Sequence, residues 1–378
     1  MSPLAVQVDT ILLKVASRCN IDCTYCYVYN MGDEGWRNMP ALISEETTEA
    51  ICRRLSELCK WQSRRFAVVL HGGEPLMLGP RRLEKLLMSL RTVLTSDYPI
   101  AIQTNGVLLT PEILDVCDLA DITLSVSIDG PAAVHDRFRI GKKGEGTHSQ
   151  TIAGITLLKE HPNSKRLFSG ILAVIDPFSD PATVYHYLKG LGAPSIDFLY
   201  RDGNHSKLPY GKLSLDSTEY AQWLTVVLDL YLSDPTPPRI RFLDDLIKLS
   251  LGGQGTKEGV GENEYGIFII DTDGSVSKND TLKSTKPGAD RFEEKWSVHS
   301  HNLSDILATD EFRQYYTLQH PTAAKCKVCP ELKVCGGGMP LHRWRDDNGL
   351  DNPSAYCADQ QALIEAIRKR MKLAGLTV

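Results

Sequence analysis

The sequence has no long apolar run. Its apolar runs, such as Phe66–Leu70 and Ile267–Ile270, are far shorter than the roughly 20 apolar residues that a membrane-spanning helix needs. The amino terminus, Met-Ser-Pro-Leu, also lacks the basic and apolar regions of a secretory signal. We therefore expect a cytoplasmic protein that does not insert into a membrane.

An excess of positive charge is missing as well. The chain carries 42 Lys and Arg against 47 Asp and Glu, for a net charge of -5, and no block of basic residues. This balance argues against a nucleic-acid partner or an anionic membrane surface. Repeats of solenoid period and low-complexity tracts are absent too. With 42% hydrophobic and 24% charged residues over 378 positions, the composition is typical of a globular protein with two or three domains, or a barrel with an appendage.

Cysteine, in contrast, is abundant, with ten residues. Disulfides do not persist in a reducing compartment, so clustered cysteines there more often bind metal or carry out chemistry. Seven of the ten lie in two tight groups. The other three, Cys52, Cys59 and Cys117, lie in helix-like stretches, and we interpret them as buried or semi-buried thiols that pack as small hydrophobes.

Strand-like and helix-like segments alternate through the first half of the chain. This alternation predicts a parallel sheet with right-handed crossovers. Six units favour a partial (β/α)6 TIM-like barrel over an open doubly wound sheet, with chemistry at the carboxyl ends of the strands. The expected strands are Ile11–Ala16, Phe66–His71, Ile100–Thr104, Ile122–Ile128, Leu167–Ile175 and Ile196–Leu199, and the first helices are Ser44–Lys60, Pro80–Ser96 and Pro111–Leu119.

The pattern changes after about residue 205. An Asp-Gly turn after Tyr265–Ile270 predicts a hairpin. A Gly-rich loop is expected at Gly252–Gly261. The expected helices are Asp216–Leu232, Arg241–Leu251, Leu303–Leu318 and Ala358–Leu373.

The first cysteine group follows the first expected strand. Cys19, Cys23 and Cys26 have the spacing C-x3-C-x2-C, which lets three thiolates converge on one metal centre. Structural zinc sites and most iron–sulfur clusters are bound by four protein ligands. Three cysteines leave one iron open to a small molecule. The alternative is half of a zinc ribbon whose other half comes from the later cysteines.

This loop resembles that of the radical S-adenosylmethionine (radical SAM) superfamily, including an aromatic residue, Tyr25, before the third cysteine. The resemblance implies a [4Fe-4S] cluster whose open iron binds S-adenosylmethionine. In the superfamily, an electron from the cluster splits this cosubstrate, and the resulting 5′-deoxyadenosyl radical abstracts a hydrogen atom from the substrate.

Further motifs follow the next three expected strands. His71-Gly72-Gly73-Glu74-Pro75 lets the backbone approach a ligand and offers a carboxylate to an ammonium group, and it resembles the superfamily's GGEP motif. Arg139 matches the arginine that pairs with the methionine carboxylate of the cosubstrate in related enzymes. Without the other motifs, Arg139 would be interpreted as a surface helix residue and Ser125 as an ordinary strand hydroxyl. By resemblance, the other residues that contact the cosubstrate are Thr104, Asn105, Ser127 and Asp129.

The second cysteine group offers four thiolates, from Cys326, Cys329, Cys335 and Cys357. Four cysteines complete either a zinc site or a closed iron–sulfur cluster. The arrangement resembles the SPASM (twitch-type) domain of peptide-modifying radical SAM enzymes. A full SPASM domain has seven cysteines, but residues 265–280 contain none, and Met339 lies near the place of another. We therefore predict one auxiliary [4Fe-4S] cluster.

The whole pattern is most similar to the cyclophane-forming peptide maturases. The similarity rests on Asp280-Thr-Leu-Lys283, His342-Arg-Trp and Asp351-Asn-Pro-Ser-Ala-Tyr-Cys357. It implies a radical SAM core at 1–205, a helical bridging region at 206–260 and a SPASM-like domain at 261–378. The reaction would remove a Cβ hydrogen from a ribosomally made precursor peptide and join that carbon to an aromatic ring.

Two other functions stay open. One is an anaerobic sulfatase-maturating, formylglycine-forming enzyme or another SPASM peptide modifier, and the other is a non-catalytic iron–sulfur or zinc module. The expected partners are the precursor peptide and a reductant such as flavodoxin or ferredoxin. The first expected strand begins within about a dozen residues of the start, so leader recognition is expected from the main body or a separate partner. The sequence does not rank the general-base candidates, which are Asp271, Asp273, His205 and His342.

Overall fold

The computed structural model describes residues 6–376, which form two compact units. The first unit comprises residues up to Ser127, then Asp136–Ser169 and Tyr265–Tyr316. The second comprises Ile128–His135, Gly170–Glu264 and residues from Thr317 onward. Neither unit is continuous in sequence, and the predicted functional boundaries at 205 and 260 stay a prediction.

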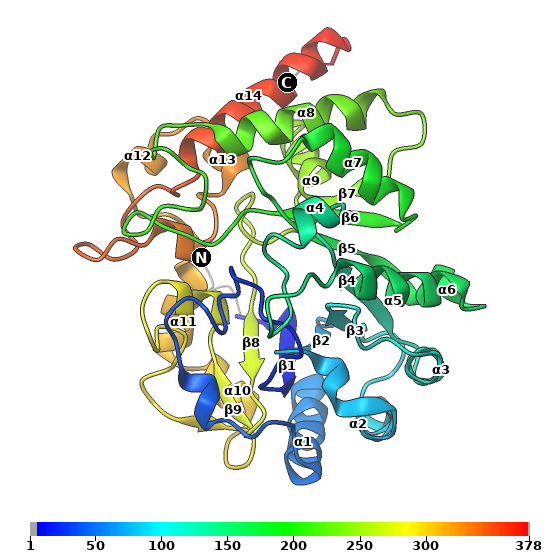
Figure 1. The fold of residues 1–378 in the computed structure, drawn as a ribbon. Helices are drawn as coiled ribbons and strands as arrows, with labels where there is room; N and C mark the ends of the chain where they lie inside the picture. Colours follow the sequence, from blue (N-terminus) through cyan, green and yellow to red (C-terminus); the bar gives the residue numbers. More distant parts are fainter. Residues whose placement is uncertain (1–5, 377–378) are drawn as a thin grey trace. The chain divides into compact units, whose positions relative to one another are not determined.

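A parallel sheet forms the centre of the first unit. Its strands alternate with helices, as the βα pattern predicts, and the order β1-β2-β3-β4 follows the chain (Figure 1). The apolar side chains of Ile11, Leu13, Val68 and Leu70 are fully buried, which accounts for the Val- and Ile-rich strand sequences. These strands are β1 (Thr10–Ala16), β2 (Ala67–Gly72), β3 (Ile100–Thr104) and β4 (Thr123–Ser127).

The other edge of β1 pairs with a strand from much later in the chain. Strand β8 (Ile267–Ile270) runs parallel to β1, with Thr10 opposite Ile267 (Figure 1). It continues through the Asp-Gly turn into β9 (Ser275–Ser277), which pairs antiparallel with β8 and with β10 (Trp296–Ser297). The predicted hairpin is confirmed, but its pairing with the first strand was not expected.

Helix caps and the spacing of apolar residues explain where the helices of the first unit form. In α1 (Glu45–Trp61), Ser44 caps the start, and the buried residues Ile51, Leu55 and Leu58 recur at helical spacing. This helix packs against α2 (Gly79–Val93). The remaining helical segments are η1 (Gly35–Asn38), η2 (Pro75–Leu78), α3 (Pro111–Leu119), α5 (His148–Glu160), α6 (Ser164–Leu167), η3 (Asp280–Ser284), α10 (Leu303–Leu307) and α11 (Asp310–Thr317).

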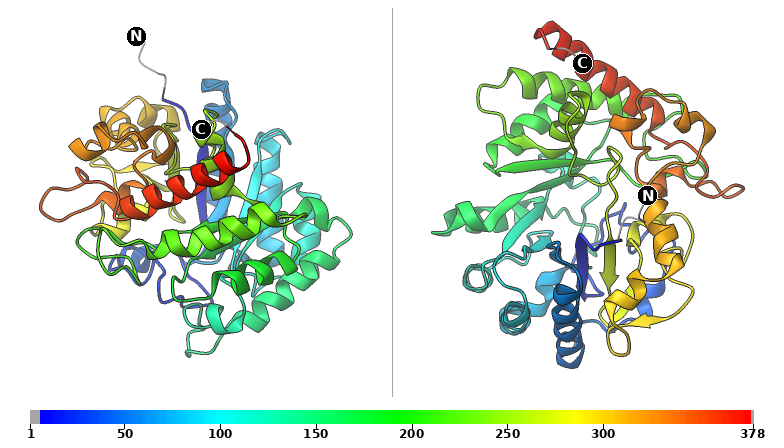
Figure 2. Two further views of the ribbon diagram at one scale, coloured as in Figure 1. Left: turned by 90° about the horizontal axis from the view of Figure 1, so that it is seen from above. Right: turned by 180° about the vertical axis from the view of Figure 1, so that it is seen from behind.

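The second unit holds the strands β6 (Ser195–Leu199) and β7 (Arg239–Ile240) and most of β5 (Phe168–Val174), all parallel. Its long helices α8 (Glu219–Ser233) and α14 (Cys357–Leu373) pack side by side, as Figures 1 and 2 both show. The others are α4 (Ala132–His135), α7 (Pro181–Gly190), α9 (Arg241–Ser250), α12 (Ala324–Lys327), α13 (Leu332–Cys335) and η4 (Pro340–Arg343).

Most predicted elements match the structure closely, and one does not. The single helix expected at Leu303–Leu318 is divided into α10 and α11. Thr309 causes the break, because its hydroxyl donates to the Ile306 carbonyl and accepts from the Phe312 amide, which starts a new helix. Between residues 6 and 376, no helix is both long and apolar enough to cross a bilayer.

Candidate active site

The first cysteine group forms a compact loop directly after β1. The amide of Cys26 donates to the Cys23 carbonyl at 3.0 Å, which curls the loop back on itself. Burial raises the pKa of Cys19 to about 12 and that of Cys26 to about 11. Without metal these thiols stay protonated, whereas bound iron would deprotonate them. Three partly or fully buried thiols on one tight loop therefore suit a cluster with one open iron.

The segment that contains Arg139 holds the loop from one side. The amides of Asp22 and Thr24 donate to the carbonyls of Ile140 and Phe138 at 2.7 and 2.8 Å. The Arg139 guanidinium donates to the Tyr25 hydroxyl at 2.9 Å. Because Arg139 is only 8% exposed, it is not a surface helix residue. Burial raises the pKa values of Cys26 and Glu74, and the charge of Arg139 opposes both rises, so all these groups lie close together.

The Gly-Gly-Glu-Pro turn packs on the backbone of the same loop. The amides of Gly73 and Glu74 donate to the carbonyls of Ala16 and Arg18 at 2.7 and 3.0 Å. A Cβ atom on Gly73 would lie 2.1 Å from the Arg18 carbonyl oxygen and from the Tyr29 hydroxyl. Glycine is therefore required here by the close approach of the two chain segments.

The Glu74 carboxylate already has three donors from the chain. Its oxygens accept from the Thr104 hydroxyl at 2.6 Å, the Asn105 amide at 2.8 Å and the Leu76 amide at 3.1 Å. Burial raises the pKa of Glu74, and these bonds oppose that rise. Since a carboxylate has about four lone-pair sites, one stays available for a ligand's ammonium group. Thr104 and Asn105 thus orient Glu74.

The ends of β3 and β4 bring further predicted residues together. The Asn105 side chain donates to Asn20 at 2.8 Å and to the Cys19 sulfur at 3.8 Å. Ser125 and Ser127 lie on the same half-exposed face of β4, and Gln103 donates to the Ser127 hydroxyl at 2.9 Å. All the predicted cosubstrate residues except Asp129 therefore lie in the first unit.

Asp129 belongs to the second unit and has a local role there. Its carboxylate accepts from the Val174 amide at 3.1 Å, and its own amide donates to His135 at 3.4 Å. It is 3% exposed. These contacts fix the turn that follows β4.

A buried ion pair that sequence reasoning did not identify as a site lies in the first unit. Lys14 and Asp280 are 4% and 0% exposed, and their charged atoms are 2.9 Å apart. The hydroxyl of Tyr27, next to Cys26, donates to Asp280 at 3.2 Å. Burial alone would raise the pKa of Asp280, but the charges of Lys14 and His71 outweigh it and lower that pKa below its ordinary value. In the sequence, Lys14 was visible as a lysine in an otherwise apolar strand and Asp280 as the first residue of the segment Asp280-Thr-Leu-Lys283.

The four general-base candidates differ in their surroundings. Asp273 is exposed and accepts from Ser275, as a turn former does, and Asp271 lies 3.6 Å from Lys14. In the second unit, His205 bonds to the Pro353 carbonyl at 2.7 Å. Burial, reinforced by the charge of Arg343, lowers the pKa of His342 to about 3, so this ring is neutral.

The second cysteine group surrounds one cavity in the second unit. This cavity measures about 370 Å³, part of it open to solvent, and all four cysteines line it. Cys326 lies in α12, Cys335 ends α13, and Cys357 begins α14, so short helices bring residues distant in sequence to one place. Burial raises the pKa of Cys335 to about 12. Four convergent thiols around a cavity of this size suit a closed metal cluster.

The three remaining cysteines belong to helices α1 and α3 and to neither cysteine group. Cys52 and Cys117 are buried and Cys59 is half-buried, within α1 and α3. Burial raises the pKa of Cys52 to about 11 and that of Cys117 to about 12. The interpretation of these residues as packed thiols is confirmed.

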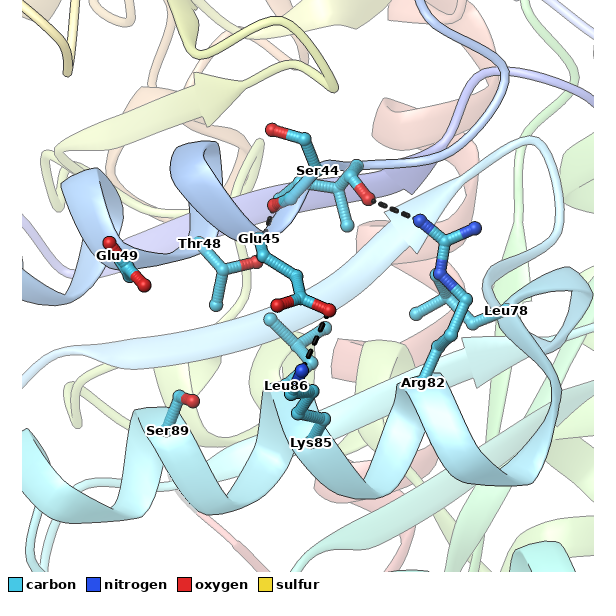
Figure 3. Close-up of a pocket in the computed structure, with 10 residues that line it drawn as sticks. Ser44, Glu45, Thr48, Glu49, Leu78, Arg82, Lys85, Leu86 and Ser89 are labelled. Atoms are coloured by element: carbon cyan, nitrogen blue, oxygen red, sulfur yellow. Dashed lines mark hydrogen bonds and ion pairs between the residues drawn. The ribbon is translucent and has the colours of Figure 1, made fainter.

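Another pocket, of about 480 Å³, lies between α1 and α2 (Figure 3). An exposed ion pair between Glu45 and Lys85, 2.7 Å long, bridges the two helices, and Arg82 donates to the Ile43 carbonyl at 3.0 Å. No cysteine lines this pocket. Its contacts join two helices and bring no reactive group together.

Residues 13–180 match the model of the Radical SAM superfamily, and this stretch contains the three-cysteine loop. The chain is a radical SAM enzyme. This radical SAM enzyme is also similar to curated proteins over nearly its whole length. It is 23% identical to a cysteine-type anaerobic sulfatase-maturating enzyme from Clostridium perfringens, over 94% of this chain and 95% of that protein. It is 24% identical to a serine-type enzyme of the same description from Bacteroides thetaiotaomicron, over 91% and 85%.

Solved structures of low sequence identity share the fold. Native anSMEcpe with bound AdoMet gives a TM-score of 0.81 at 21% identity, over 98% of this chain and 100% of that one. Streptococcus suis SuiB bound to precursor peptide SuiA gives 0.65 at 14% identity, over 93% and 76%. The fold is thus a mixed α/β radical SAM fold with a parallel sheet and a carboxyl-terminal extension like that of anSMEcpe.

Proposed function

We propose that this radical SAM enzyme oxidises a cysteine or serine side chain of a peptide or protein to formylglycine. The observation that carries this proposal is the end-to-end similarity to sulfatase-maturating enzymes of both the cysteine and the serine type. The comparisons favour this function, which the sequence ranked second, over the cyclophane formation that it ranked first.

In this proposal, Cys19, Cys23 and Cys26 hold the cluster that binds S-adenosylmethionine. Bound together, cluster and cosubstrate would supply the adenosyl radical that abstracts a hydrogen atom. The second group, Cys326, Cys329, Cys335 and Cys357, holds one auxiliary cluster, and a small redox protein such as flavodoxin or ferredoxin delivers electrons. The residues assigned to the cosubstrate are Tyr25, Gly72, Gly73, Glu74, Pro75, Thr104, Asn105, Ser125, Ser127, Asp129 and Arg139.

Oxidation of a CH2–XH side chain, where X is sulfur or oxygen, removes one hydrogen atom, one electron and one proton. The product is a CH=X group, and water replaces sulfur by oxygen in the cysteine case. The proton needs an ionised acceptor. Asp280 suits this role because Lys14 keeps its carboxylate ionised and because Tyr27, the residue after Cys26, donates a hydrogen bond to it.

Mass spectrometry with matched peptides tests this function. The reconstituted, reduced enzyme is incubated with peptides that differ only by Cys, Ser or Ala at one position. We expect an aldehyde, trapped by an aminooxy probe, on the Cys or Ser peptide and none on the Ala peptide. Cleavage of S-adenosylmethionine without any aldehyde on either peptide would contradict the proposal.

Cyclophane formation is the second candidate. The missing cysteines at 265–280 and the segments His342-Arg-Trp and Asp351–Cys357 favour it. Its product also loses two hydrogens but contains no aldehyde. A peptide that becomes lighter by two hydrogens, fails to react with the aminooxy probe and resists fragmentation between the joined residues would identify it.

A further inference from the structure

Arg343 is a buried cation without an anionic partner. It is 1% exposed, and it is among the largest side chains of the described chain to be fully buried. One guanidinium nitrogen donates to the carbonyls of Leu318 and Gln319, while Nε has no hydrogen-bond partner. No carboxylate in residues 6–376 forms an ion pair with it, although a buried charge is costly unless it is paired.

The three buried lysines of residues 6–376 show the usual solution, and one of them, Lys283, lies 3.5 Å from both Asp33 and Asp290. Lys14 pairs with Asp280 in the first unit, and Lys212 pairs with Asp359 in the second. Arg343 departs from this rule within the same unit as Lys212. The positive charge of Arg343 is therefore not balanced by a carboxylate of residues 6–376.

Cys326 and Cys335 of the second group are the groups whose negative charges, once the thiols are deprotonated, act on Arg343. Three consecutive left-handed glycines lead from Cys335 into η4, which ends at Arg343. The Asn352 side chain donates to the Arg343 carbonyl at 2.9 Å, and the amide of Cys357 donates to Ser354 at 2.8 Å, so Arg343 is tied to the segment before the fourth cysteine. Burial lowers the pKa of Arg343 to about 10, and charges on Cys326 and Cys335 oppose that shift.

We propose that Arg343 is the counter-ion of the iron–sulfur cluster held by Cys326, Cys329, Cys335 and Cys357, and that it raises the cluster's reduction potential. The inference rests on the proposed auxiliary cluster. Iron bound by four thiolates carries net negative charge, and each added electron increases it. A fixed positive charge nearby favours the reduced form, which suits a cluster that accepts electrons.

A redox titration tests this role. In the full-length chain with Cys19, Cys23 and Cys26 changed to Ala, only the second cluster contributes to the electron paramagnetic resonance signal. Arg343→Gln should lower the midpoint potential by about 59 mV, a tenfold change in the one-electron equilibrium. Arg343→Lys keeps the charge and should stay near the starting value. The control, Arg370→Gln, removes an arginine whose ion pair with Asp229 lies at the surface of α14 and should change nothing.

Each outcome decides the question. Equal potentials for the starting protein and Arg343→Gln, or equal shifts for the Gln and Lys variants, would overturn the role of charge. If the Gln variant assembles no cluster, retention of iron by the Lys variant supports the proposal, and loss of iron from both, with chains folded by circular dichroism, overturns it. Failure of the unsubstituted Arg343 protein to bind iron at these cysteines would instead refute the auxiliary cluster itself.

Discussion

At the scale of single residues, one buried ion pair sets the protonation state of a carboxylate in the first unit. Asp280 and Lys14 are each costly to bury alone, and together they keep a carboxylate ionised beside the three-cysteine loop. Tyr27 adds a hydroxyl donor to the same carboxylate. The arrangement therefore keeps an ionised carboxylate out of contact with bulk water, as the proposed proton acceptor requires.

Asp280→Asn should separate cosubstrate cleavage from product formation. The variant still forms 5′-deoxyadenosine but makes far less oxidised peptide, because the substrate proton has no acceptor. It also leaves Lys14 with only the more distant Asp271, 3.6 Å away, and should cost up to about 3–5 kcal/mol of unfolding free energy, measured by chemical denaturation. The control, Asp273→Asn, changes an exposed turn residue and should leave both quantities unchanged. Wild-type product yield from the Asp280 variant would refute its role.

Gly73→Ala should destabilise the loop that holds the first cluster. The added methyl would lie 2.1 Å from backbone and hydroxyl oxygens, so the turn must move, at a cost of at least about 1–3 kcal/mol. Iron content and thermal stability should both fall. Gly190→Ala is the matched control, because a Cβ there meets nothing within 4 Å and the position ends helix α7. Equal effects at both positions would be inconsistent with the packing described.

Asp234 should contribute stability that depends on pH in a narrow window. A hydrogen bond from Lys189, with others from Thr236 and Tyr185, lowers the pKa of Asp234 from 3.8 to about 2. Because the folded-state pKa lies below the unfolded one, this stabilisation is complete above pH 3.8 and is lost as the pH falls toward 2. The difference in melting temperature between wild type and Asp234→Asn should shrink over that range. A constant difference would contradict the ion pair.

At the scale of elements, helix caps explain where chain segments begin and why one prediction failed. Ser44 starts α1 by accepting from the Thr47 amide at 3.0 Å, and the sequence revealed this cap because two carboxylates follow it. Thr309 caps α11 in the same way and is also followed by two carboxylates, Asp310 and Glu311, but the apolar spacing continues across it and predicts one helix. Periodicity predicts that a helix exists more reliably than where it is interrupted.

Ser44→Ala should remove the cap and cost about 0.5–2 kcal/mol of unfolding free energy. Ser89→Ala is the control, since Ser89 lies inside α2 on the same pocket and makes no side-chain hydrogen bond in the described structure (Figure 3). Urea denaturation of both variants measures the difference. A loss at Ser89 as large as at Ser44 would argue against the capping role.

The candidate site was also predictable to different degrees. The cysteine loop and the Gly-Gly-Glu-Pro turn were apparent because their residue types and spacing define their chemistry. Lys14 and Asp280 were not, because their pairing depends on β8 lying beside β1, a long-range contact without a local signal. For the same reason, the sequence did not reveal that Arg343 would be buried without a carboxylate.

At the scale of the whole molecule, the two cysteine groups lie in different compact units. We therefore expect that a substitution can remove one cluster and leave the other in place. A Cys335→Ala variant should lose the iron of one cluster and the peptide product while it still cleaves S-adenosylmethionine. A Cys23→Ala variant should abolish that cleavage and keep the other cluster. Iron and sulfide analysis, with chromatography of 5′-deoxyadenosine, measures both. If Cys335→Ala abolished cosubstrate cleavage in a folded protein, the two centres would not be independent.

The pairing of β8 with β1 also has a consequence for biosynthesis. The first strand leaves the ribosome long before residues 267–284, yet its edge and the Lys14 ammonium find their partners only there. Until that stretch is translated, an unpaired strand edge and an uncompensated lysine stay exposed on the nascent chain. Asp280, the proposed proton acceptor, is thus absent throughout early synthesis, and the site is completed late, when most of the polypeptide already exists.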